Sequence, residues 1–220
     1  MFDLSYLLER LAFIATYIPV TMALALLAMV TGTFVGTLIA IIRHNKIPFI
    51  DQILAIYVSF FRGTPLIVQL FLFYFGLPQL IPSVSTTTAI TMSVIVLSIN
   101  ASAYISETVR AAINSVDQDQ MEAAISIGMS KVKAMLRIIL PQATRIAIPP
   151  LSNTFISLIQ GTAITFTIGV TEMMGIAKIG AAASYKFLES YLAVGLLYWM
   201  ITYVSAKLLH LLEKRLARAY

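Results

Sequence analysis

The run LAFIATYIPVTMALALLAMVTGTFVGTLIAII, residues 11–42, contains no charged residue. A helix needs roughly 20 mostly apolar residues to cross the hydrocarbon core of a bilayer. This run is longer than that, so we expect its helix to tilt or to project from the membrane. Asp3, Glu9 and Arg10 flank it in place of the basic cluster of a signal peptide. We therefore expect a membrane span here rather than a cleavable signal.

The rest of the chain shares this apolar character. Of its 220 residues, 59% are hydrophobic and 11% are charged, whereas a soluble domain has about 45–50% apolar and about 25% charged residues. One soluble core of this size cannot bury the excess, so lipid is the expected solvent. The chain has no cysteine, which excludes disulfides, thiolate metal sites and cysteine nucleophiles.

Further apolar runs follow the first one along the chain. We expect an all-α polytopic membrane bundle of about five transmembrane helices, forming a single domain over residues 1–220. Residues 161–180 are too interrupted for one helix. The expected spans cover residues 11–42, 51–80, 86–110, 142–165 and 187–212.

Basic residues indicate the orientation of this bundle. Lys and Arg concentrate in the segments after the first, third and fifth apolar runs, and such residues in short loops mark the cytoplasmic side. The N-terminus is then outside and the C-terminus inside, as an odd number of spans requires. The net charge of +5 thus reflects membrane orientation, and we expect no nucleic-acid partner.

Small residues recur along one face of the first span. Ala28, Gly32, Gly36 and Ala40 are spaced by four, which puts them on one side of a helix and permits close approach of a second helix. That second helix belongs either to a neighbouring span of the same chain or to another subunit.

The segment 111–141 is the sizeable polar stretch, and it predicts two short helices joined by a glycine. Asp119 is expected to cap the first helix, with Glu122 completing a capping box. Gly128 ends it, since glycine tolerates left-handed backbone, and Ser130 caps the second helix. Pro141 marks a break or kink before the fourth span. Such an element either rests on lipid headgroups or docks a cytoplasmic partner.

A resemblance favours docking. The run EAAISIGMSKVKAMLRIILP, residues 122–141, resembles the loop of permease subunits of bacterial ATP-binding-cassette (ABC) importers, whose pattern is E-A-A, three residues, G, nine residues, then I-x-L-P. In that family the loop inserts a short helix into a groove of the ATPase subunit, so the resemblance implies a coupling role for this segment. The coupling residues are Glu122, Ala123, Ala124, Gly128 and Pro141.

Three more segments resemble the polar amino-acid permeases of this family. They are FRGTPLIVQL (61–70), AYISETVRAAI (103–113) and PLSNTFISLI (150–159), the last followed by Thr171-Glu172. Relatives commonly carry K-D-T-S-L where this chain has Gln160-Gly161-Thr162-Ala163-Ile164, so a charged pair is lost. The runs IPVT and IGVTEMMG resemble cystine systems, which makes cystine or another polar amino acid the expected substrate.

The energy source and the partners follow from the same resemblance. The chain contains no G-x-x-x-x-G-K-[ST] motif, so it lacks a phosphate-binding loop, and we expect neither catalytic residues nor a metal or cofactor in it. The resemblance implies ABC ATPase subunits that bind ATP and Mg, a second permease copy or paralogue, an extracellular binding protein, and the bacterial cytoplasmic membrane. An ion-gradient-driven secondary transporter and a non-transporting scaffold are the alternatives.

Polar residues within the apolar runs are candidates for the substrate pathway. Arg62 either serves transport, bonds carbonyls freed by Gly63 and Pro65, or lies in the membrane interface. Glu107 and Arg110, one helical turn apart, form an ion pair or an inner gate. The remaining polar groups make interhelical hydrogen bonds or line the pathway. The pathway candidates are Arg62, Gly63, Thr64, Pro65, Gln69, Asn153, Thr162 and Glu172.

Overall fold

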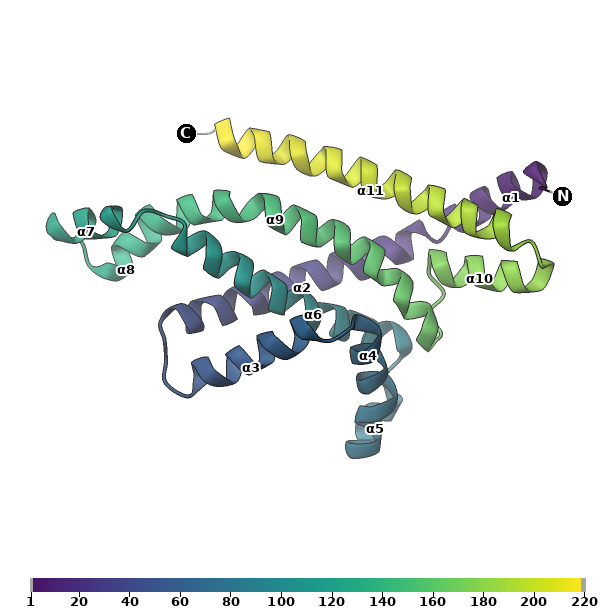
Figure 1. Cartoon of the computed structure of the whole chain (residues 1–220), viewed down its shortest axis with the longest axis horizontal. Helices are drawn as coiled ribbons and strands as arrows, with labels where there is room; N and C mark the ends of the chain where they lie inside the picture. Colours follow the sequence, from purple (N-terminus) through teal and green to yellow (C-terminus); the bar gives the residue numbers. More distant parts are fainter. Residues whose placement is uncertain (1, 219–220) are drawn as a thin grey trace.

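The structure is a computed structural model that describes residues 2–218, with the side chains of residues 2–215. In this part of the chain every regular element is helical. The long helices α2 (Ile18–His44), α6 (Ala89–Asn114), α9 (Leu140–Gly161) and α11 (Phe187–Arg218) pack into a bundle (Figure 1). The expected all-α helix bundle is confirmed.

Three helices of the described chain are long and apolar enough to cross a membrane, namely α2, α6 and α11. Two further candidates are bent helix pairs. Ile50–Gly63 and Leu66–Leu80 meet at 111°, and Lys131–Ile168 and Met173–Ser184 meet at 49°. By length and composition, the described chain therefore has three candidate spans, or up to five if each bent pair counts as one, and five is the number of apolar runs expected from the sequence.

The first apolar run is divided between two helices. α1 (Leu4–Ala15) ends where the hydroxyl and the amide of Thr16 both bond back to the Phe13 carbonyl. α2 then starts with Pro19 in its first turn, where proline's missing N–H costs nothing. α1 packs on α11 and on α10 (Met173–Ser184). The expected single tilted helix over residues 11–42 is thus replaced by a break at residues 16–17.

The predicted small-residue face of α2 packs against α6 of the same chain. Ala28, Gly32, Gly36 and Ala40 are all buried. A Cβ built on Gly32 would lie 2.9 Å from the Ala101 Cβ, and one built on Gly36 would lie 2.7 Å from a backbone carbonyl oxygen of α6. Only glycine permits this approach of the two backbones, so the ridge serves an intrachain contact.

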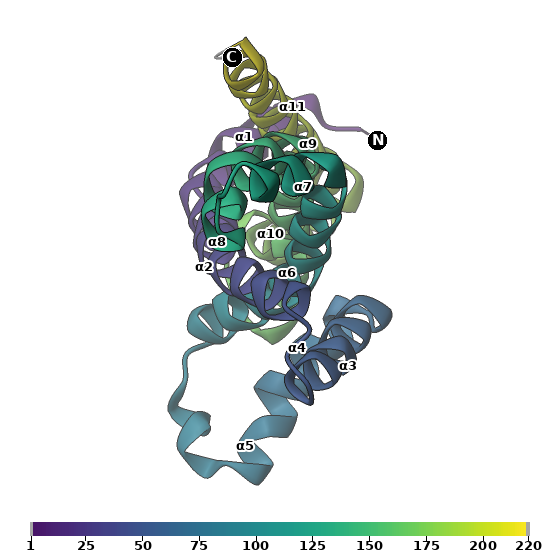
Figure 2. The same ribbon diagram turned by 90° about the vertical axis from the view of Figure 1, so that its left-hand side faces the viewer.

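A side branch leaves the bundle between α2 and α6. Figures 1 and 2 show α4 and α5 pointing away from the axis along which α2 and α6 run. Its elements are α3 (Ile50–Gly63), α4 (Leu66–Phe71), a π-helical turn (Leu72–Gly76), α5 (Leu77–Leu80) and a 3₁₀ turn (Pro82–Thr86). The sharp bend falls at the Gly63-Thr64-Pro65 interruption, where Pro65 lacks the N–H that would continue α3.

The polar loop forms the two predicted short helices, α7 (Gln118–Ser126) and α8 (Lys131–Ala134). Gly128 has φ +89°, and the Ser130 side chain accepts from the Lys133 amide at 3.3 Å, so the glycine turn and the second cap are confirmed. The expected Asp119–Glu122 capping box is wrong, because Asp117 caps α7 by accepting from the Asp119 amide at 3.0 Å. A π-helical turn (Met135–Ile139) then continues α8 into α9. The expected break at Pro141 is absent, because Pro141 lies in the first turn of α9, where its missing N–H costs no hydrogen bond.

Large apolar side chains cover the outside of the bundle. Val30 and Phe34 on α2 are 67% and 68% exposed, and Trp199 on α11 is 68% exposed. Soluble monomers rarely expose extended apolar patches, whereas lipid-facing helices must. The exposed faces of α2 and α11 therefore fit contact with lipid.

At the end away from α7 the chain is broken again, as the sequence of residues 161–180 predicts. A 3₁₀ turn (Thr162–Ile168) follows α9, and α10 begins after it at Met173. α10 packs beside α11 and α1. The break thus folds the chain back over the end of the bundle where α1 lies (Figure 1).

Candidate functional site

A cavity of about 430 Å³ lies between α4, α6 and α9. Its apolar lining comes from Leu66, Leu97 and Leu158, among others. No charged side chain is among the residues that line it in the described chain. The polar groups that face it are amides and hydroxyls, contributed by Asn100 and Tyr104 of α6 and by Asn153, Thr154 and Ser157 of α9. The cavity thus offers neutral hydrogen-bonding groups between apolar walls, as ligand sites commonly do.

A buried amide network supports the cavity beside the bend of α3. Gln69 is fully buried and donates to the carbonyls of Phe61 and Thr64, at 2.9 Å and 3.1 Å. Asn100 donates to the same Phe61 carbonyl at 3.1 Å and to the Gln69 side chain at 2.9 Å. Carbonyls freed by the bend are therefore bonded by Gln69 and Asn100, not by Arg62.

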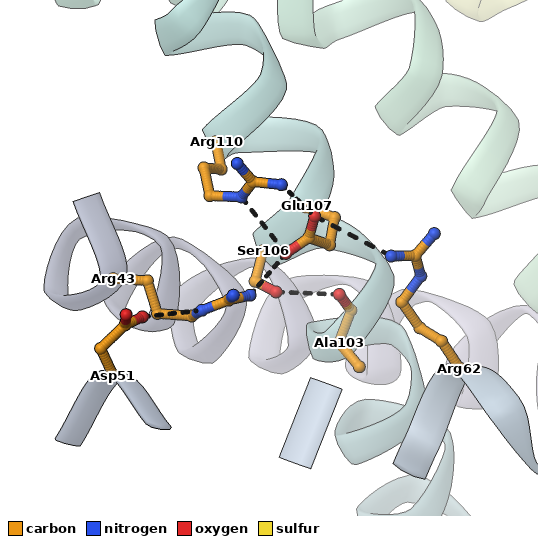
Figure 3. Close-up of polar contacts among 7 residues, drawn as sticks. All are labelled: Arg43, Asp51, Arg62, Ala103, Ser106, Glu107 and Arg110. Carbon is orange, nitrogen blue, oxygen red and sulfur yellow. Dashed lines mark hydrogen bonds and ion pairs between the residues drawn. The ribbon is translucent and has the colours of Figure 1, made fainter. Parts of the chain in front are cut away.

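Arg62 and the predicted Glu107–Arg110 pair belong to one charged cluster (Figure 3). Glu107 accepts from Arg110 at 2.6 Å and from Arg43 at 2.5 Å, and Arg43 also pairs with Asp51 at 3.2 Å. An Arg62 nitrogen lies 3.9 Å from Glu107. The cluster ties α2, α3 and α6 together around one carboxylate.

Sequence reasoning found the Glu107–Arg110 pair because its members are three positions apart on one helix. It missed Arg43 and Asp51 as members. Arg43 lies in the last turn of α2 and Asp51 in the first turn of α3, so nothing in their local spacing points to Glu107. Both were visible only as charged residues at the ends of apolar runs.

Glu172 and Thr162 lie in a second polar network. Glu172 is fully buried and caps α10, its carboxylate accepting from the Gly175 amide at 2.8 Å and from the Tyr198 hydroxyl at 2.7 Å. The hydroxyls of Tyr198 and Thr162 lie 3.4 Å apart, and Thr21 of α2 approaches Glu172 at 3.4 Å. These residues join α2, α10 and α11, and the described lining of the cavity contains neither Glu172 nor Thr162.

The predicted pathway residues thus lie at four places, of which the charged cluster with Arg62 and the network of Glu172 and Thr162 are described above. Asn153 lines the cavity, and Gln69 reaches it through Asn100. Gly63, Thr64 and Pro65 form the bend behind it, with the Thr64 hydroxyl accepting from Gln69 at 2.9 Å. Missing from the prediction were Asn100, Tyr104 and Ser157. The available signal was helical spacing. Asn100 and Ala101 lie four and three positions before Tyr104 on one face of α6, and Asn153 lies four positions before Ser157 on one face of α9.

The α7–α8 end of the molecule exposes an apolar surface. Ile127, Val132 and Leu136 are 79%, 69% and 60% exposed. Glu122 and Ala123 are exposed beside them, whereas Ala124 is buried and packs α7 onto the rest of the loop. Pro141 lies in the first turn of α9, at the base of this surface. Figure 2 views the molecule with α7 and α8 in front.

Comparison with known proteins gives one family. Residues 32–218 match the model described as "Binding-protein-dependent transport system inner membrane component". The probable amino-acid ABC transporter permease protein PatM of Vibrio harveyi is 44% identical, over 100% of this chain and 98% of that protein. The L-cystine transport system permease protein TcyB of Bacillus subtilis (strain 168) is 40% identical, over 90% of this chain and 84% of that protein.

The solved structures agree. One described as "Crystal structure of an amino acid ABC transporter with histidines" superposes with a TM-score of 0.91 at 35% identity, covering 98% of this chain and 99% of the other. An inward-facing MetNI methionine ABC transporter shares the fold at 17% identity and a TM-score of 0.71, covering 90% of this chain and 94% of the other. Fold, loop sequence and full-length similarity converge, and the chain belongs to the family of binding-protein-dependent transport system inner membrane components.

Proposed function

We propose that this chain is the membrane-spanning permease subunit of an ATP-driven amino-acid importer, and that its cavity is the passage for the amino acid. The observation that carries the proposal is the cavity itself, about 430 Å³ of space lined by amides and hydroxyls within a bundle of apolar helices. Relatives named as amino-acid permeases match almost the full chain.

The energy for transport comes from separate ATPase subunits that bind ATP and Mg. The exposed surface of Ile127, Val132 and Leu136 supports this, because apolar side chains at the end of a bundle favour a protein partner. Glu122 stands exposed beside it as the anchor, Ala123 permits close contact, and Gly128 sets the turn between α7 and α8. The assembly also contains a second permease, identical or paralogous, and an extracellular binding protein that delivers the substrate.

Within the passage, Asn153 contacts the substrate, while Gln69, Thr64 and Pro65 hold the bend that shapes the wall. Glu107 and Arg110 act as an inner gate at the end of α6 nearer to α7. Glu172 and Thr162 fix α10 against the bundle and affect transport indirectly.

The substrate we propose is a polar amino acid, with cystine as the first candidate. A cavity with hydroxyls and amides but no charged lining suits a polar side chain without net charge, and the distal half of cystine, with one ammonium and one carboxylate, meets that condition. The 40% identity with the L-cystine permease TcyB supports cystine, though PatM, named only for amino acids, is more similar at 44%.

Reconstitution in proteoliposomes tests the function. The permease, its ATPase and its binding protein are assembled, and uptake of radiolabelled cystine and of a mixture of polar amino acids is measured. We expect uptake that requires ATP and the ATPase. Uptake driven by a proton or sodium gradient alone identifies a secondary transporter, and an intact complex that hydrolyses ATP without any uptake identifies a scaffold.

A further inference from the structure

Every polar group that lines the cavity is neutral, yet a free amino acid carries a carboxylate and an ammonium group. Asn100 uses its amide N–H groups on Phe61 and Gln69, which leaves its side-chain oxygen as an acceptor for an ammonium group. Asn153 and Ser157 are exposed toward the cavity. What the lining lacks is a cation for the carboxylate, and carboxylates in proteins are bound best by a planar guanidinium.

Arg62 is the cation beside the cavity. Its guanidinium carbon lies 5.6 Å from the ring centroid of Tyr104, and Tyr104 lines the cavity at its end nearer to α7. The side chain is 45% exposed and makes no side-chain hydrogen bond within the described residues. Stacking on Tyr104 keeps the guanidinium at the cavity's edge without occupying its N–H donors.

The ion pairs around Glu107 leave Arg62 available. Arg43 and Arg110 contact the Glu107 carboxylate at 2.5 Å and 2.6 Å, whereas Arg62 stands at 3.9 Å (Figure 3). The cluster contains three guanidiniums against the carboxylates of Glu107 and Asp51, so one positive charge is unbalanced. A substrate carboxylate would balance this charge. To bind it, Arg62 gives up only its 3.9 Å contact with Glu107, which is the longest of the three arginine contacts with that carboxylate.

We propose that Arg62 binds the α-carboxylate of the transported amino acid at the end of the cavity nearer to α7, and that the neutral lining selects a side chain without net charge. The inference rests on the proposed function and refines it. Tyr104 is then a positioning residue, since its ring holds Arg62 in place.

The experiment uses the purified ATPase–permease complex in detergent. It is dialysed against an equimolar mixture of the proteinogenic L-amino acids and cystine, and retained amino acids are identified by mass spectrometry. The best-retained amino acid then competes with its own α-carboxamide. We expect the best-retained amino acid to have a side chain without net charge. We also expect a preference of about tenfold or more for its carboxylate over its carboxamide, as a lost charge-assisted hydrogen bond implies.

Variants assign this preference to Arg62. Arg62→Gln is expected to reduce it to about one, and Arg62→Lys to keep part of it, because a point charge remains without the planar fork. Arg43→Gln is the matched control, since it removes the same charge from the same Glu107 carboxylate, whereas the guanidinium over the Tyr104 ring is that of Arg62, and it keeps the preference. Tyr104→Leu removes the ring that holds Arg62 but changes no charge, and it is expected to lower the preference for the carboxylate. This variant tests the proposal if Arg62→Gln does not assemble with the ATPase.

An unchanged preference in Arg62→Gln overturns the role of Arg62. Retention of lysine, arginine, aspartate or glutamate as the main ligand overturns the selection for side chains without net charge. If the wild-type complex retains no amino acid at all, the inference fails, whereas ATP-dependent uptake with the binding protein present still upholds the proposed function.

Discussion

At the scale of single residues, glycines determine how near α2 and α6 approach. The packing leaves no volume for a side chain at Gly36. A Cβ added there would lie 2.7 Å from a backbone carbonyl oxygen of α6 and 2.9 Å from the Cβ of Ile105. Backbone cannot move aside as a flexible side chain does. The spacing of small residues by four on α2 predicted a close helix contact, and the structure shows that the contacting helix is α6.

Gly36→Leu is therefore expected to separate the two helices and to destabilise the protein by about 1–3 kcal/mol. Thermal unfolding of the purified protein in detergent measures the effect. Gly195→Ala is the control, because a Cβ there meets nothing within 4 Å, and alanine is the better helix former. Equal melting temperatures for Gly36→Leu and wild type would contradict the packing argument.

A residue-scale ion pair outside the spans connects the N-terminus to the start of α11. Lys186 donates to Asp3 at 2.5 Å, and this hydrogen bond lowers the pKa of Asp3 well below its usual range while it raises the pKa of Lys186. A carboxyl whose folded-state pKa is depressed contributes stability above its unfolded value, about 3.9, and loses it as pH falls through the folded value.

The amide protection factors of α1 should accordingly stay level from about pH 5 to pH 8 and decline in stronger acid. Asp3→Asn should lower them at neutral pH and reduce the acid dependence. Hydrogen–deuterium exchange with mass spectrometry reads the effect on α1 directly. Glu9→Gln, a change at an exposed position on the same helix, serves as control. If it lowered the α1 protection factors at neutral pH as much as Asp3→Asn does, the assignment of the effect to Asp3 would be refuted.

At the scale of elements, the sequence predicts local features such as turns and caps better than it predicts the angles between helices. The glycine turn at Gly128 and the cap at Ser130 were predictable because each depends on its own neighbours. The break at Thr16 was not, since the uncharged run continues through it. The interruption at Gly63-Thr64-Pro65 was visible, but its angle of 111° depends on contacts with Asn100, which lies on another helix.

Gly128→Val should disrupt the α7–α8 turn and abolish association with the ATPase while membrane insertion continues. A β-branched residue at φ +89° is strained by roughly 1–2 kcal/mol or more. Co-purification of the tagged ATPase measures the outcome. Gly128→Asn is the matched variant, because asparagine tolerates left-handed backbone and should retain binding. Normal co-purification of Gly128→Val would count against docking through this turn.

At the scale of the whole molecule, the cavity and the α7–α8 surface lie at separate places on one bundle. α6 passes along the cavity and then leads into α7, so it joins the two sites. The sequence located the surface from its loop pattern. It located only part of the cavity, since helical spacing groups Tyr104 with Asn100 and Ser157 with Asn153 but does not show that these faces of α6 and α9 meet.

Coupling between the two sites should be reciprocal. A substrate-loaded binding protein is expected to stimulate ATP hydrolysis by the complex in proteoliposomes, and an ATPase variant that binds but does not hydrolyse ATP should change the affinity for the binding protein. Colorimetric phosphate release measures the first effect. The same hydrolysis rate with loaded, empty and absent binding protein would show that the sites are not coupled.

The close contact of α2 with α6 has a consequence for the transport cycle. Helices whose backbones touch at Gly32 and Gly36 can neither slide nor roll past one another, so they travel as one rigid body. If the proposed transport rotates parts of the bundle, we expect the rotation at the two bends of the described chain, residues 63–65 and the short link between the 3₁₀ turn and α10. A disulfide engineered across α2 and α6 should leave turnover intact, whereas one that locks the bend at residues 63–65 should stop it.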